Sequence, residues 1–109
     1  MNNPANEIQV EFDAAQRARA NNNEGQVRVC ARRAAGIAIR DYLTRKGTPL
    51  PSRSAHDLLN FIKEETPLPP DLKLAADHLT LRVTEEFKLP VEADLVAEAK
   101  LLCDWLLKN

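Results

Sequence analysis

The apolar residues of this chain recur at intervals of three and four, and no segment shows the apolar–polar alternation of a β-strand. This spacing places apolar side chains on one side of an α-helix, where they pack against neighbouring helices. Clusters of asparagine, glycine or proline, which end helices, separate five such segments. The pattern predicts an all-α fold, an up-and-down bundle of four to five helices with short connections. At 109 residues the chain is expected to form one domain, 1–109.

Capping residues and helix breakers define the expected helix boundaries. Asn3 followed by Pro4 is typical of a helix start, because asparagine caps the first turn and proline suits its first position. Ser54 and Asp57 form a capping-box-like pair at the start of a later helix. The predicted helices cover about 4–20, about 24–46, Ser54 to the proline-rich segment at 66–70, a stretch beginning near Pro70, and about 92–107, with 82–90 as a frayed helix end and a loop.

The second predicted helix combines small residues with arginine. Arg28, Arg32 and Arg40 share one ridge of i+4 spacing with Gly36. A glycine within a helix costs about 1 kcal/mol relative to alanine, so close approach of another helix is its favoured explanation and a ligand groove the second. The seam expected to pack inward is Val27, Cys30, Ala31, Ala34, Ile37, Ala38 and Tyr42.

Charge is distributed unevenly, although the net charge is only −1. Residues 17–53 hold nine Lys/Arg and two acids, whereas residues 54–109 hold six Lys/Arg and eleven acids. Either the two halves neutralise each other within the bundle or a dimer, or the protein presents a basic surface. Arginine pairs equally well with carboxylates and with phosphates. The arginines that could line a nucleotide or RNA groove are Arg32, Arg33, Arg40 and Arg45.

The cysteines and histidines show no metal-binding spacing. Cys30 and Cys103 lie in apolar helical patterns without a nearby Cys or His, so we expect reduced core residues and no metal or cofactor. The alternative is a disulfide between them, which requires that their two helices touch. His78 and Glu98 are expected on solvated faces. His56 is interpreted as a partly exposed residue at a helix start, with a phosphate or proton-transfer contact in a groove as the alternative.

Nothing in the sequence indicates a membrane or secreted protein. No apolar run approaches the roughly 20 residues of a membrane span. The first residues lack the basic start and apolar core of a secretory signal. These features predict a cytoplasmic location.

The order of the features is itself informative. A small-residue helix at 29–38, a Lys-Gly turn, a Ser-Ala-His-Asp-Leu-Leu helix start at 54–59, a proline break and Arg82 precede a final Ala/Leu helix. Over about residues 8–107 this order resembles the HEPN domain (higher eukaryotes and prokaryotes nucleotide-binding). The resemblance implies a bundle of four main helices and a short one, commonly a homodimer. It also implies a minimal nucleotidyltransferase as partner, in two-component or toxin–antitoxin systems.

The active members of that family are metal-independent ribonucleases with the motif Arg-x(4–6)-His. Their arginine stabilises charge on the scissile phosphate, and their histidine exchanges protons with the RNA oxygens. Here the matching arginine is Arg82, and the positions for the histidine hold Phe87, Lys88 and Leu89. The resemblance therefore implies a chain without the catalytic site, and we assign no catalytic residue.

Three functions remain open. The first is a catalytically silent HEPN-like module for dimeric interaction or nucleotide sensing. The second is an RNA- or nucleotide-binding module, or a toxin-type ribonuclease with a divergent site, that uses the second helix. The third is a helical adaptor unrelated to HEPN, favoured if the second helix does not pack antiparallel to the last. The candidate nucleotide- or RNA-binding residues are Arg32, Arg33, Arg40, Arg45, His56 and Arg82.

Overall fold

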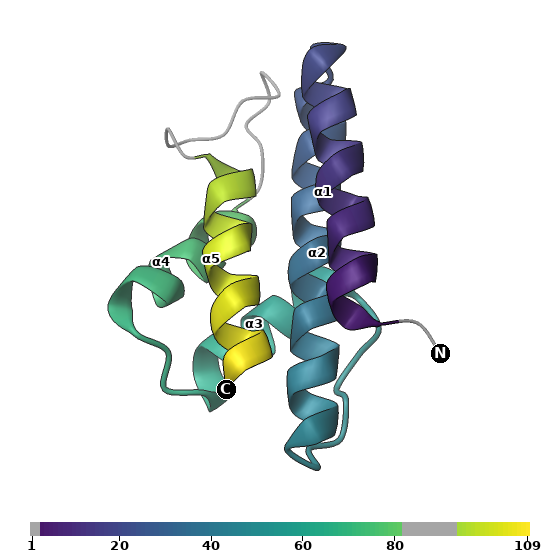
Figure 1. Ribbon diagram of the computed structural model, residues 1–109. Helices are drawn as coiled ribbons and strands as arrows, with labels where there is room; N and C mark the ends of the chain where they lie inside the picture. The colour runs from purple at the N-terminus through teal and green to yellow at the C-terminus, as the bar shows by residue number, and fades with distance from the viewer. Residues whose placement is uncertain (1–2, 82–93) are drawn as a thin grey trace.

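The computed structural model describes residues 3–81 and 94–109, which form five α-helices and no β-strand (Figure 1). The all-α bundle predicted from the apolar periodicity is confirmed. The predictions for residues 82–90, including Arg82, lie outside the described residues. The helices are α1 (Pro4–Ala20), α2 (Glu24–Arg45), α3 (Ala55–Glu65), α4 (Pro70–Leu79) and α5 (Leu95–Lys108).

The helix starts follow the capping residues. The Asn3 side chain accepts a hydrogen bond from the amide of Ala5, and α1 begins at Pro4 as predicted. The last helix begins at Leu95 rather than near 92, because the side chain of Asp94 caps its first turn. At α1 and α5 the helix therefore begins where a side chain satisfies the first amides, whereas α4 begins at Pro70 without a side-chain cap.

The start of α3 is capped by two serines. Ser54 Oγ accepts a hydrogen bond from the amide of Asp57 at 3.4 Å, which is half of the predicted capping box. The Asp57 carboxylate accepts instead from Ser52 Oγ, at 3.0 Å. Ser52 Oγ in turn accepts from the amide of Ser54 at 3.1 Å, so the box closes through Ser52. This network fixes the first turn of α3, which matters for the site below.

The long helix α2 lies at the centre of the bundle. It packs against α1, α3 and α5, whereas α4 packs mainly against α5 and α3. The sequence predicted one inward seam, but helices on three sides bury more of the circumference of α2. Ile37 and Tyr42 remain partly exposed. Residues outside the predicted seam that are also buried are Ala35, Gly36, Ile39 and Leu43.

Helices α2 and α5 pack along each other in the same direction (Figure 1). Cys103 Sγ lies 3.5 Å from the carbonyl oxygen of Ala34, and further along both helices Arg45 reaches the carbonyl of Leu106. The expected antiparallel packing is therefore wrong. In a bundle whose main helices alternate in direction, the second and the fourth run parallel. This packing follows from the up-and-down order, so it does not separate the three functions.

The interior is apolar and the surface carries the charges. Among the described residues no charged or polar side chain is buried. Within residues 3–81 and 94–109 no helix combines the length and the apolar character needed to cross a membrane.

Candidate functional site

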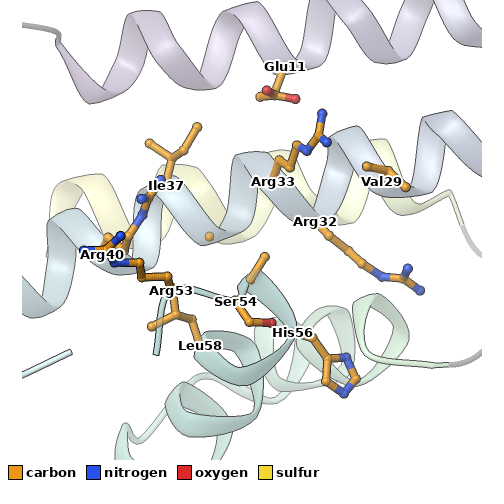
Figure 2. A pocket seen from close by; sticks show the side chains of 12 residues that line it. Glu11, Val29, Arg32, Arg33, Ile37, Arg40, Arg53, Ser54, His56 and Leu58 are labelled. Carbon is orange, nitrogen blue, oxygen red and sulfur yellow. The ribbon is translucent and has the colours of Figure 1, made fainter. Parts of the chain in front are cut away.

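A groove of about 450 Å³ lies where the first turn of α3 meets the middle of α2, with Glu11 of α1 at its edge (Figure 2). In this view Arg32 and His56 lie toward one end of the groove, and Arg40 and Arg53 lie toward the other. Arg33 points toward Glu11. We call this feature the arginine groove, defined by Arg32, Arg33, Arg40, Arg53 and His56.

Gly36 forms part of the floor of the arginine groove. A Cβ atom added at Gly36 would lie 3.0 Å from Ala55 Cβ and 3.3 Å from Ala55 Cα. The missing side chain therefore lets the start of α3 lie directly against α2. The predicted close helix approach is confirmed, and the same residue also lines a groove.

Positive charge dominates the arginine groove. Four arginines line it, and among residues 3–81 and 94–109 Glu11 is the only acidic residue that does so. Within the described part of the chain, no carboxylate lies within 4.0 Å of the guanidinium groups of Arg33, Arg40 or Arg53. The first turn of α3 adds the positive end of a helix dipole. The groove is therefore suited to an anion.

Arg32 differs from the other three arginines because its guanidinium already has protein partners. Its Nε donates to the carbonyl oxygen of Leu79 at 2.6 Å, and its Nη2 donates to that of Leu81 at 2.8 Å. Burial, with a smaller contribution from the neighbouring Arg28 cation, lowers the pKa of Arg32 below its usual value. Arginine nevertheless stays protonated in proteins, so Arg32 brings a full positive charge to the groove.

Arg45 lies outside the arginine groove, near the far end of α2. Its Nε is 2.8 Å from the Asp41 carboxylate, and its Nη2 donates to the carbonyl oxygen of Leu106 at 2.6 Å. Arg45 thus binds the C-terminal end of α5, where backbone carbonyls have no partner within the helix. Of the predicted site residues, the structure brings together Arg32, Arg33, Arg40 and His56.

Arg53 is a groove residue that the sequence reasoning did not select. It stands directly before Ser54, the N-cap of α3. A cation next to a cap at a helix start faces whatever that helix start faces, and this position was the available signal.

The two histidines have different surroundings. His56 is partly buried and lines the arginine groove, next to the N-cap of α3. His78 was predicted on a solvated face, and this is wrong: its side chain is 17% exposed and its Nδ1 lies 2.7 Å and 2.9 Å from the two oxygens of the Glu98 carboxylate. Glu98 is likewise mostly buried, at 22% exposure. The reason is that α4 packs on α5, a contact between distant segments.

The two cysteines are buried free thiols, as the sequence predicted. Burial, with a smaller effect from Asp104, raises the pKa of Cys103 to about 12, so this thiol stays protonated at neutral pH. In the described residues, no group of three or more His, Cys, Asp or Glu side chains is arranged to hold a metal ion.

Comparisons of this chain with models of protein families, with curated proteins and with solved structures found no match.

Proposed function

We propose that this protein binds a nucleotide through its phosphate groups in the arginine groove, without cleaving it. One observation carries the proposal: Arg33, Arg40 and Arg53 share one groove, and none has a carboxylate partner among the described residues. All three guanidinium groups are exposed, and an anion that contacts more than one of them would gain charge-assisted hydrogen bonds.

The size and lining of the groove support a mononucleotide. Its volume of about 450 Å³ lies within the range of small-molecule sites, roughly 300–1,000 Å³. Val29 and Ile37, both partly exposed, add apolar surface beside the arginines, against which a base or ribose can pack. A phosphate chain on the arginines with a nucleoside on this apolar surface uses both parts of the lining.

The sensing role within a HEPN-like domain is part of the same proposal. It is supported by the order of sequence features and by the absence of a histidine at positions 87–89 after Arg82. A domain of this kind reports a bound nucleotide to a partner, for which we propose a minimal nucleotidyltransferase in a toxin–antitoxin type of system.

Calorimetric titration with ATP, GTP and a short RNA tests the proposal. We expect ATP or GTP to bind, with an affinity that falls steeply between about 50 and 200 mM salt, as phosphate contacts require. Arg40→Ala and Arg53→Ala should each weaken binding by about tenfold, since each removes a charge-assisted contact. Arg17→Ala is the matched control, because Arg17 is an exposed arginine of α1 outside the groove. Equal losses in all three variants, or no binding at low salt, would refute the proposal.

A second function, RNA cleavage in the same groove, is favoured by one observation. His56 lines the groove together with the arginines, and a histidine with arginines is the residue set that metal-independent RNA cleavage uses. Cleavage of a labelled RNA in the presence of a chelator would support this function if His56→Asn abolished it. Intact RNA after prolonged incubation, with nucleotide binding present, leaves the sensing function.

We also propose a homodimer in the cytoplasm. The resemblance to HEPN domains supports the dimer, because members of that family are commonly homodimers. The two free thiols agree with a reducing compartment. Light scattering after gel filtration should give twice the chain mass of 12.2 kDa, and a single-chain mass at high concentration would count against the dimer.

A further inference from the structure

Arg32 belongs to two sites at once. It lines the arginine groove, and it donates hydrogen bonds to the carbonyls of Leu79, the last residue of α4, and of Leu81. Carbonyls at a helix end have no partner within the helix, so Arg32 supplies one. Within the described residues these are the only hydrogen bonds between the side chains of α2 and the end of α4.

The guanidinium of Arg32 retains donors for a ligand. An arginine side chain carries five N–H bonds in a planar fork, and two of them are used on Leu79 and Leu81. The two carbonyls fix the plane of the fork before any ligand arrives. The remaining N–H groups are therefore already oriented, which reduces the entropy lost on binding.

The surroundings of Arg32 make an anion favourable. The side chain is partly buried, and burial and the Arg28 cation both lower its pKa. Burying the charged guanidinium beside Arg28 costs free energy. Two carbonyl dipoles offset that cost only in part, whereas a phosphate brings a full opposite charge. A phosphate in the groove therefore stabilises Arg32 in the position in which it holds the end of α4.

We propose that Arg32 couples nucleotide binding in the arginine groove to the attachment of the end of α4: a phosphate on its free N–H groups tightens its hold on Leu79 and Leu81. Coupling of two sites is reciprocal, so a firmly attached α4 also raises the affinity of the groove. In this proposal Arg32 binds the phosphate and also positions the end of α4. The inference rests on the proposed function of the groove, and it adds a route by which a bound nucleotide changes how firmly the end of α4 is attached.

Amide hydrogen exchange measured by NMR, with and without saturating ATP, tests the coupling. The amide of Thr80 donates to Ala76 at 3.2 Å and that of Leu81 donates to His78 at 3.3 Å, so both report on the end of α4. We expect ATP to slow their exchange by about fivefold or more. Bound ATP with unchanged or faster exchange would overturn the coupling and leave the proposed function intact. Absence of ATP binding would overturn both.

Two lysine variants separate coupling from binding. Arg32→Lys keeps the charge but loses the fork, so at saturating ATP it should show no slowing at Thr80 and Leu81. Arg40→Lys is the matched variant within the groove: it should bind ATP more weakly and still show the slowing once saturated. Slowing that survives in Arg32→Lys would overturn the inference.

A variant outside the groove tests the reciprocal direction. Lys63 Nζ lies 3.2 Å from Asp77 Oδ1 and 3.1 Å from Thr80 Oγ1, and Lys63 does not line the groove. Lys63→Met removes these bonds and loosens α4, so it should weaken ATP binding by about threefold or more. This arm keeps the test decisive if Arg32→Lys does not fold. An affinity equal to that of the wild type would overturn the coupling.

Discussion

At Gly36 the absence of a side chain determines how closely two helices approach, and this predicts the effect of one methyl group. Gly36→Ala gains about 1 kcal/mol of helix propensity. The new Cβ would, however, lie 3.0 Å from Ala55 Cβ and 3.3 Å from its backbone Cα. Overpacking of this kind costs about 1–3 kcal/mol. We expect a net loss of about 1 kcal/mol in the free energy of unfolding, measured by urea denaturation.

Gly25 provides the matched control for Gly36. It also lies in α2, but the nearest atom to an added Cβ is 3.7 Å away, at the Arg28 side chain. Gly25→Ala should therefore be as stable as the wild type or more stable. If Gly36→Ala were also as stable as the wild type, the contact between α2 and Ala55 would not be as tight as described.

The buried thiol of Cys103 predicts a loss of stability in alkaline solution. Burial raises its pKa from 9.0 to about 12, so the folded protein keeps a proton that the unfolded chain releases. The stabilisation is complete below pH 9 and is lost as the pH rises toward 12, by at most about 1.4 kcal/mol per pH unit. Urea denaturation at pH 8 and pH 10 should show a smaller loss for Cys103→Ala than for the wild type. Parallel losses would mean that other groups account for the effect.

At the scale of the element, the arginines of α2 divide into two kinds, and substitution should separate them. Arg45→Met removes the hydrogen bond to Leu106 and the ion pair with Asp41. Because Arg45 is 40% exposed, we expect a loss of only about 1 kcal/mol in stability, with ATP affinity unchanged. Arg40→Met should change stability by less than about 0.5 kcal/mol and weaken ATP binding. Urea denaturation and titration of both variants measure the difference, and a loss of ATP affinity in Arg45→Met would contradict this division.

The helices show which features a sequence predicts and which it does not. Asn3 and Ser54 cap their own helices, so the boundaries follow from neighbouring residues. Arg40 and Arg45 look alike in sequence, and only the position of the end of α5 decides that Arg45 is used for structure. The pairing of His78 with Glu98 likewise depends on how α4 meets α5. Local pattern therefore predicted the helices, whereas contacts between distant segments divide the site residues.

At the scale of the whole molecule, charge is distributed unevenly. The net charge is only −1, but four arginines and one glutamate line the arginine groove. Repulsion among its cations opposes folding when no anion is bound, which is a common cost of a functional site. A ligand that binds only the folded state removes that cost and stabilises it, by about 2.7 kcal/mol at a concentration of one hundred times its Kd.

The melting temperature should therefore rise with ATP concentration in the wild type, beyond the effect of sodium chloride at equal ionic strength. The double variant Arg40→Ala/Arg53→Ala should be at least as stable as the wild type without ATP, because it relieves the repulsion in the groove. It should gain little from ATP, since it lacks two of the phosphate contacts. An equal rise in both proteins would place the bound ATP elsewhere on the surface. A double variant that is clearly less stable without ATP would show that these arginines hold the fold together.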